Sequence, residues 1–164
     1  MAQITDRLAE SELFSGLNQD QLIVLADASR KWELRSGEPL IEEDEQGYCV
    51  YLIIEGRVDV TISIPNSNQG EMIATLKEGD VVGELALVGR ALRSANVIAK
   101  TDLQLIAWNT DELLKILESD LPIGYRVMFN LAKLMAGRLT SANLVIRNLA
   151  PSGSHELNIH DDAS

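Results

Sequence analysis

The chain has 164 residues, 46% of them hydrophobic and 24% charged, which fits a single folded domain and excludes a fully disordered chain. Its 14 basic and 25 acidic residues give a net charge of −11, which disfavours binding to nucleic acid or to anionic lipid. No apolar run reaches the roughly 18 residues of a membrane helix, and no secretory signal is visible. The single cysteine, Cys49, excludes an intramolecular disulfide. These features predict a cytoplasmic protein.

Helical patterns occupy about the first 30 residues. Apolar residues between Ile4 and Phe14 are spaced loosely along one helix face, and Gly16 ends this pattern. Asn18 is then expected to cap a second helix, with Gln21 at its third position to complete a capping box.

The hydrophobic period changes to two between about Trp32 and Trp108. Val58–Ile64 alternates as a half-buried strand does, and Val50–Ile54 has the composition of a more buried strand. Between them, Gly56 is expected at a positive φ angle in a tight turn. Two further short strands are expected, at Ala95–Thr101 and Leu103–Ala107. Many short strands at regular spacing predict an antiparallel barrel, roll or sandwich.

A helical period returns after the strands. Thr110 is expected to cap a short helix, because two acidic residues follow it. Asp120 and Pro122 then begin a longer helix over about residues 121–149, roughly 42 Å at 1.5 Å per residue. The polar residues 150–164 are expected to form a disordered tail.

Apolar residues at spacings of three and four form a stripe along this long helix. They are Met128, Leu131, Met135, Ala142, Val145 and Leu149. Because so long a helix extends beyond what one small domain covers, we expect the stripe to pair with a second copy in a homodimer. The alternative is that the stripe packs into the core of its own domain.

The segment most informative about function is Gly83–Ala95, where helix-forming residues interrupt the strand region. A short helix there exposes backbone N–H groups that favour an anion, and Gly83 lets a ligand approach closely. The guanidinium of Arg93 is suited to pair with two phosphate oxygens, and Ser94 adds a hydroxyl donor. The carboxylate of Glu84 is suited to accept hydrogen bonds from a sugar. A ribose phosphate site is one interpretation, and a structural ion pair between Arg93 and Glu84 is the other, which the residues alone favour.

The wider sequence adds a resemblance to a known family. Gly83–Leu87 followed by Arg93–Ala95 resembles the phosphate-binding cassette of the cyclic nucleotide-binding domain family. That family includes catabolite-activator-type bacterial regulators and the regulatory subunits of cyclic-AMP-dependent protein kinase. Four more segments resemble the family's entry motif, its β-roll turns and the lead into the cassette. They are Leu13–Leu17, Ser36–Ile41, Tyr51–Val58 and Glu78–Val82.

The resemblance implies a mixed α+β fold, an antiparallel, jelly-roll-like β-roll flanked by N-terminal helices and a long C-terminal helix. The domain would span residues 1–149, with the roll at about 32–108, the helix at about 121–149 and the tail at 150–164. The chain ends about 15 residues after that helix, so a stand-alone module without a helix-turn-helix domain, which does not bind DNA, is expected.

The resemblance also implies which residues bind the ligand. They are Gly83, Glu84, Leu85, Ala86, Arg93, Ser94, Ala95 and Asn143. Backbone groups of the first cassette residues would line the phosphate, and Glu84 would bind the ribose 2′-hydroxyl. Arg93 would pair with the cyclic phosphate, helped by Ser94 and by the backbone of Ala95. The spacing between Glu84 and Arg93 equals that of the kinase regulatory type.

The long helix departs from the family pattern. In the catabolite-activator type this helix supplies Thr and Ser to the adenine, where the present chain has Ala142 and Asn143. The amide of Asn143 is therefore left to contact a purine edge.

The predicted function is reversible binding of a purine cyclic mononucleotide, with cyclic AMP preferred over cyclic GMP because Ser94 rather than threonine follows Arg93. Phosphate binding is expected to reposition the long helix and to signal to an unidentified downstream protein. No cofactor, no metal and no membrane partner are expected. No enzyme activity is expected either, since no nucleophile–base pair lies in the folded part.

Two alternatives remain open. The chain is either such a sensor or an interaction and dimerisation scaffold that keeps the fold without sensing a ligand. Retention of Gly83, Glu84, Arg93 and Ser94 together argues against the scaffold, because a buried arginine without a partner is costly. A third possibility is a fragment of a longer regulator or channel.

Overall fold

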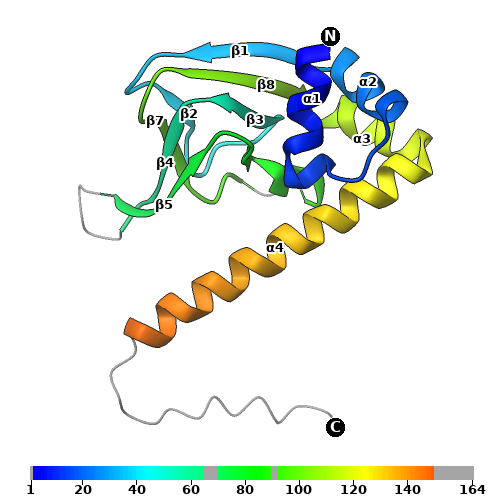
Figure 1. Cartoon of the computed structure of the whole chain (residues 1–164). Coiled ribbons are helices and arrows are strands. Elements are labelled where there is room, and N and C mark those ends of the chain that lie inside the picture. The colour runs from blue at the N-terminus through cyan, green and yellow to red at the C-terminus, as the bar shows by residue number, and fades with distance from the viewer. Residues whose placement is uncertain (1, 65–69, 90–91, 150–164) are drawn as a thin grey trace, which may run out of the picture.

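Two antiparallel sheets form a β-roll, and the helices gather at one end of it (Figure 1). The computed structural model describes residues 2–64, 70–89 and 92–149, with side chains described between Ile4 and Asn143 in these ranges. The expected tail lies outside the described residues. The predicted mixed α+β class, with N-terminal helices, a roll and a long C-terminal helix, is confirmed. The bounds given for the domain as a whole stay a prediction.

Each sheet has four strands, and every neighbouring pair is antiparallel. The first sheet has the order β1-β8-β3-β6, formed by Arg30–Leu34, Leu103–Asn109, Cys49–Glu55 and Val81–Val82. The second has the order β2-β7-β4-β5, formed by Pro39–Ile41, Asn96–Ala99, Arg57–Ile62 and Glu71–Lys77. The segment 83–95 therefore connects β6 of one sheet to β7 of the other.

The turn between β3 and β4 depends on Gly56, as expected. Gly56 has a φ angle of 98°, and a Cβ atom there would lie 2.4 Å from the backbone oxygen of Asp102. Both the left-handed backbone and the close approach exclude other residues. This turn brings β3 of the first sheet next to β4 of the second.

The N-terminal helices α1 (Ala2–Glu10) and α2 (Gln19–Asp27) flank a 3-10 turn, η1 (Glu12–Phe14). The predicted capping box of α2 is confirmed. The Gln21 backbone donates to Asn18 Oδ1, and the Asn18 backbone donates to Gln21 Oε1, each over 3.0 Å. Local side chains thus satisfy N–H groups that the first turn of α2 leaves free.

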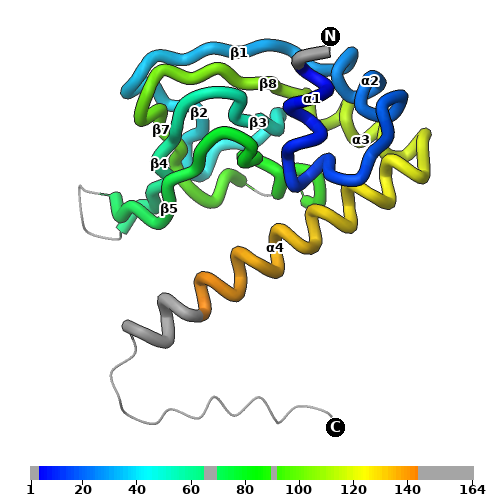
Figure 2. Tube along the Cα trace, viewed as in Figure 1, coloured from blue at the N-terminus to red at the C-terminus, as the bar shows by residue number. Residues whose placement is uncertain are grey.

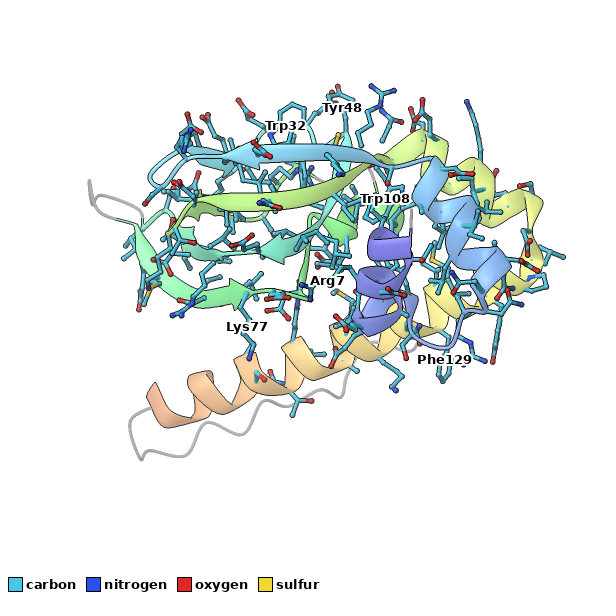
Figure 3. The ribbon with its side chains drawn as sticks, turned by 45° about the horizontal axis from the view of Figure 1, so that its top comes forward. Arg7, Trp32, Tyr48, Lys77, Trp108 and Phe129 are labelled. Carbon is cyan, nitrogen blue, oxygen red and sulfur yellow. The ribbon has the colours of Figure 1, made fainter. Side chains whose placement is uncertain are left out.

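The larger hydrophobic core lies between the helices and the first sheet, and it includes Trp108 of β8 (Figure 3). The ring of Trp108 packs 5.1 Å from that of Phe14, and its Nε1–H donates to the Leu25 backbone oxygen over 2.8 Å. A buried indole keeps its N–H paired in this way. A smaller core inside the roll holds Ile41, Ile53, Val58, Val82, Val97, Ala99, Leu103 and Leu105.

The cap of helix α3 (Thr110–Ser119) differs from the prediction. Asn109, not Thr110, is the N-cap, and its Oδ1 accepts from the backbones of Asp111 and Glu112. Thr110 lies inside the first turn, buried, with no hydrogen-bond partner for its hydroxyl among the described residues. The preference of asparagine for cap positions is at least as strong as that of threonine, and Asn109 is the residue that ends β8.

Helix α4 (Leu121–Leu149) leaves the helical cluster and runs along one side of the roll (Figures 1 and 2). Asp120 Oδ1 accepts from the Ile123 backbone over 3.1 Å at its start. Gly124 lets α4 approach α3, because a Cβ atom there would lie 2.2 Å from the Leu117 backbone oxygen. Among the helices of the described residues, none combines the length and the hydropathy needed to cross a membrane.

The apolar stripe assigned to self-association lies partly in the protomer's own core. Leu131 is buried, and Met128 and Met135 pack against the same core. Among the described side chains of α4, Leu121, Tyr125 and Phe129 are exposed, and Leu139 is exposed where it lines the cavity described below. The spacing of three and four between apolar residues does not by itself predict which apolar residues of α4 pack against the domain.

Candidate functional site

A cavity of about 1560 Å³ lies between the roll and α4. Its walls come from β4, β5, residues 83–86 and 92–95, and the middle of α4. Seven of the eight predicted site residues line it, and they are Gly83, Glu84, Leu85, Ala86, Arg93, Ser94 and Ala95. Asn143 is exposed on α4 and is not among the lining residues, whereas Ser141 and Ala142 are.

The segment after β6 turns sharply at Gly83. Gly83 has a φ angle of 78° and begins a 3-10 turn, η2 (Glu84–Leu87), with no side chain capping it. The helix-forming composition of this segment extends to Leu92, but η2 ends at Leu87, shortly before Gly89, a poor helix former. The turn buries Glu84 and leaves Leu85 exposed toward the cavity.

Arg93 is held by backbone groups rather than by a carboxylate. Its Nη2 donates to the Cys49 oxygen over 2.7 Å and its Nη1 to the Gly83 oxygen over 3.2 Å. The Arg93 backbone pairs with the loop before β3, accepting from Asp44 N over 2.9 Å and donating to the Glu45 oxygen over 2.8 Å. No carboxylate of the described residues forms an ion pair with it. Three of its five N–H groups donate no hydrogen bond to the described residues.

Glu84 has a different partner from the one predicted. It is 2% exposed and accepts a hydrogen bond from Arg138 Nη1 of α4, in a charged pair. Arg138 Nη2 also donates to the Val81 oxygen over 3.0 Å. The structural ion pair between Arg93 and Glu84 is therefore not formed, and Arg138 joins the cassette to α4.

Arg138 is the site residue that the sequence analysis missed. It lies four positions before Ala142, on the same face of α4. That spacing was the available signal, because Ala142 already stands at a ligand-contacting place of the family pattern. Its partner Glu84 is 54 positions away in sequence, so the pair itself needs the fold.

Tyr51 interacts with Arg93 but carries no negative charge that would compete with an anionic ligand. Burial, and after it the neighbouring Cys49, raise the pKa of Tyr51 to about 12, while Arg93 acts in the opposite direction. Tyr51 therefore stays neutral at physiological pH. The cavity wall thus offers a cation, a paired carboxylate and apolar side chains, which suit an anionic ligand with a hydroxyl and a flat apolar ring. The apolar part includes Ile41, Val60, Met72, Ile73, Leu76, Val82 and Val97.

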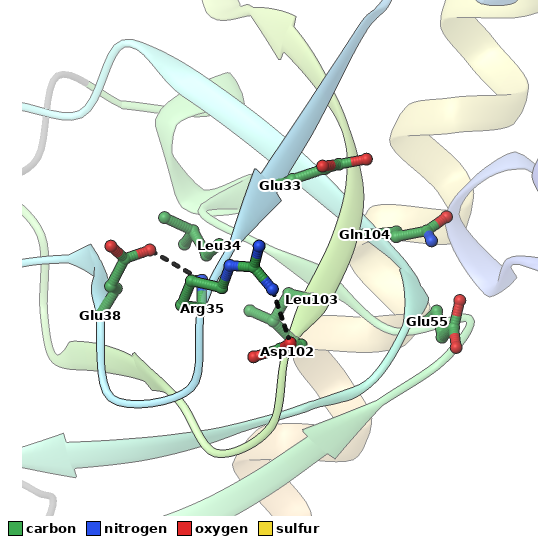
Figure 4. A pocket seen from close by; sticks show the side chains of 8 residues that line it. All are labelled: Glu33, Leu34, Arg35, Glu38, Glu55, Asp102, Leu103 and Gln104. Carbon is green, nitrogen blue, oxygen red and sulfur yellow. Dashed lines mark hydrogen bonds and ion pairs between the residues drawn. The ribbon is translucent and has the colours of Figure 1, made fainter.

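A second hollow of about 370 Å³ lies at the far end of β1 (Figure 4). It is lined by four carboxylates, those of Glu33, Glu38, Glu55 and Asp102. The one cation among its lining residues, Arg35, pairs with Asp102 over 3.2 Å. The Ser36 backbone N–H donates to Asp102, and the Arg35 backbone N–H donates to Glu38. The Ser36 N–H, and then Arg35, lower the pKa of Asp102. These bonds hold a turn, and no group of acidic, cysteine or histidine residues in the described ranges is arranged for a metal ion.

Comparison with known proteins identifies the family. The sequence profile described as "Cyclic nucleotide-binding domain" matches residues 31–120, more than half of the chain. The chain belongs to the cyclic nucleotide-binding domain family. The match includes the cassette from Gly83 to Ala95, so the predicted resemblance is confirmed.

Individual relatives give the same picture. The chain is 33% identical over 98 residues to human cGMP-dependent protein kinase 2, covering 60% of this chain and 13% of the kinase. It is 34% identical over 110 residues to the cAMP-dependent protein kinase regulatory subunit of Yarrowia lipolytica, covering 67% of this chain and 28% of that protein. The crystal structure of the Thermus thermophilus Catabolite Activator Protein superposes with a TM-score of 0.74 and 29% identity, covering 85% and 63% of the two chains. The chain thus spans only a small part of the protein kinases it matches.

Proposed function

We propose that this domain binds a purine cyclic mononucleotide in the cavity between the roll and α4. The observation that carries the proposal is Arg93, a half-buried cation on the cavity wall with no carboxylate partner among the described residues. A cyclic phosphate carries one negative charge, and its two free oxygens match a guanidinium fork. Binding would therefore neutralise the charge of the Arg93 guanidinium, which in the protein alone contacts only two carbonyl oxygens.

The ribose is the second part of the proposed ligand. Gly83 contacts Arg93, and Glu84 follows it directly, so a sugar attached to the phosphate would lie near the Glu84 carboxylate. The 2′-hydroxyl would donate to Glu84, which is an acceptor with lone pairs beyond the one that Arg138 uses. The base would lie against the apolar part of the wall.

Signalling would pass through Arg138. Because this residue of α4 shares Glu84 with the ligand, arrival of the ribose changes the contact that holds α4 to the cassette. A ligand that interacts differently with two positions of α4 shifts their populations. Asn143 would contact the base only after α4 moves, since it does not line the cavity in the present arrangement.

The base preference rests on Ser94 rather than on the relatives, whose names include both cGMP and cAMP. With serine after Arg93 and without hydroxyls at Ala142 and Asn143, we expect cyclic AMP to bind more tightly, by less than about 100-fold. On this proposal the domain is a cytoplasmic sensor with no catalytic activity, no cofactor and no DNA or membrane partner. It would act on a downstream protein and pair with itself through α4.

The test is isothermal titration of the intact chain with cyclic AMP and cyclic GMP. Arg93→Ala should weaken cyclic AMP binding by about 2–5 kcal/mol, since a desolvated charge-assisted contact is lost. Arg93→Lys should recover part of the loss, because lysine keeps the charge without the fork. The matched control is Arg35→Ala, which removes an exposed, ion-paired arginine at the other end of the roll and should leave affinity unchanged.

Wild-type affinity in both Arg93 variants would overturn the phosphate assignment. A folded wild-type protein that binds neither nucleotide at millimolar concentration would instead support the scaffold alternative. Tighter binding of cyclic GMP would overturn only the role given to Ser94.

A further inference from the structure

Two glycines from separate loops enclose the guanidinium of Arg93. A Cβ atom on Gly47 would lie 2.2 Å from Arg93 Nε and 2.3 Å from Cζ. A Cβ atom on Gly83 would lie 2.5 Å from Arg93 Nη1. All three distances are far below a van der Waals contact, so the guanidinium occupies space that a side chain at either position would fill. We call the space between Gly47 and Gly83 the glycine slot.

The two glycines are required for different reasons. Gly83 has a φ angle of 78°, and its Cβ atom would also lie 2.8 Å from the Cys49 oxygen, so the turn itself needs glycine there. Gly47 has no φ in the left-handed region, and the three atoms nearest to its Cβ atom all belong to Arg93. The φ angle at Gly47 therefore does not require glycine, whereas the position of the guanidinium does.

Hydrogen bonds also hold the Arg93 side chain that lies in the glycine slot. Its two terminal nitrogens donate to Cys49 and Gly83, and its backbone is paired with Asp44 and Glu45. A methyl group on Gly47 would push the guanidinium away from these carbonyl oxygens. The arginine would keep its charge but lose the orientation of its fork.

We propose that Gly47 is a positioning residue for the anion site, keeping the Arg93 guanidinium in the plane that a phosphate meets. The inference rests on the proposed function for its ligand, but the geometry it describes exists without ligand. The β2–β3 loop that carries Gly47 thereby becomes part of the cyclic nucleotide site, although Gly47 does not line the cavity.

The experiment compares Gly47→Ala with wild type, with Arg93→Ala and with the double variant, by titration with cyclic AMP. Gly47→Ala should weaken binding by about 10- to 100-fold in the wild-type background and by less than about twofold in the Arg93→Ala background. The matched control is Gly79→Ala, at a φ of 89° with nothing within 4 Å of its Cβ atom. It should lower the melting temperature without changing affinity, whereas Gly47→Ala should change affinity with little change in melting temperature.

A ligand-free readout separates this inference from the proposed function. The Nε–H resonance of Arg93, assigned by its loss in Arg93→Lys, should shift in Gly47→Ala and stay in place in Gly79→Ala. If wild type binds no nucleotide, the proposed function fails and the resonance still decides the role of Gly47. An unshifted resonance, or equal loss of affinity from Gly47→Ala in both backgrounds, would overturn the inference.

Discussion

Arg93 and Glu84 line one cavity, but they do not pair with each other. Each has other hydrogen-bond partners. Arg93 uses the carbonyl oxygens of Cys49 and Gly83, and Glu84 uses Arg138. A direct pair between the two would neutralise the cation that an anionic ligand needs. Carbonyl oxygens position a guanidinium without cancelling its charge, so the site keeps a full positive charge available.

The backbone of Asp44 is a second residue-scale feature of the site. Asp44 has a φ angle of 67°, and it is the one non-glycine residue with positive φ in the described part of the chain. Its N–H donates to the Arg93 oxygen over 2.9 Å, so the left-handed conformation helps to hold the cassette arginine. Aspartate tolerates this region better than most residues, but glycine occupies it with less strain.

We therefore expect Asp44→Gly to raise the free energy of unfolding by about 0.5 kcal/mol and Asp44→Ala to lower it by about 1 kcal/mol. Neither change should alter the affinity for cyclic AMP by more than about threefold, because the backbone bond to Arg93 is kept. Urea denaturation measures the first effect and titration the second. Glu45→Ala is the neighbouring control and should be neutral. An Asp44→Ala variant more stable than Asp44→Gly would contradict the strain argument.

The sequence identified the cassette residues because they are local. Gly83, Glu84, Arg93 and Ser94 lie within twelve consecutive positions, and local spacing is what a pattern records. Arg138 and Gly47 were missed because their roles exist only where α4 and the β2–β3 loop meet the cassette. The spacing of Arg138 from Ala142 was a weak signal, and Gly47 had none.

At the scale of elements, α4 is joined to the roll by contacts of two kinds. Its first half is packed, through Ile123, Val127 and Leu131, into the larger core. Further along, the Arg138 pair with Glu84 and its bond to Val81 join it to the cassette. The packed half is held by the core, so on the proposed function the half beyond it is the part expected to respond to a ligand at Glu84.

Replacing Arg138 with methionine should leave the buried Glu84 carboxylate without its ion-pair partner. We expect a loss of stability of about 1–3 kcal/mol, since the carboxylate is 2% exposed. Glu84→Gln should restore part of that stability in the double variant, which a thermodynamic cycle measures. The control is Arg126→Met, on the same helix and without an ion pair among the described residues.

The same variant tests the coupling of ligand to helix. Hydrogen exchange of residues 121–143 should change when cyclic AMP binds to wild type, and this change should shrink in Arg138→Met. An equal ligand-induced change in both proteins would show that α4 responds through another contact.

The elements follow from sequence where one local signal dominates, and less well where two compete. The capping box at Asn18 has no rival, whereas Asn109 and Thr110 are adjacent cap formers and the stronger one is used. The helix-forming composition of the cassette extends to Leu92, but η2 ends at Leu87, because that composition does not outweigh a glycine two residues later. For α4, the spacing of apolar residues predicted an apolar stripe, but only the structure shows which face of the helix packs against the core.

At the scale of the whole molecule, charge and apolar surface are unevenly distributed. The chain has a net charge of −11, yet α4 contains four basic residues and no acidic one. Helix α4 also exposes two aromatic side chains, Tyr125 at 68% and Phe129 at 48%, with their rings stacked 6.0 Å apart. A second copy of α4 is a partner that would cover these side chains.

We therefore expect the intact chain to form a homodimer at tens of micromolar, measured by sedimentation equilibrium. Tyr125→Ser with Phe129→Ser should weaken the dimer at least about tenfold, because each change removes apolar surface that the second copy would bury. Trp32→Ser is the control, an aromatic residue that is also half exposed but lies across the roll from α4 (Figure 3). Two copies of charge −11 repel each other, so raising NaCl from about 0.05 to 0.5 M should strengthen an apolar dimer. If salt weakens it, the basic flanks of α4 bind the acidic roll of the other copy instead, and a monomer with and without nucleotide would reject self-association altogether.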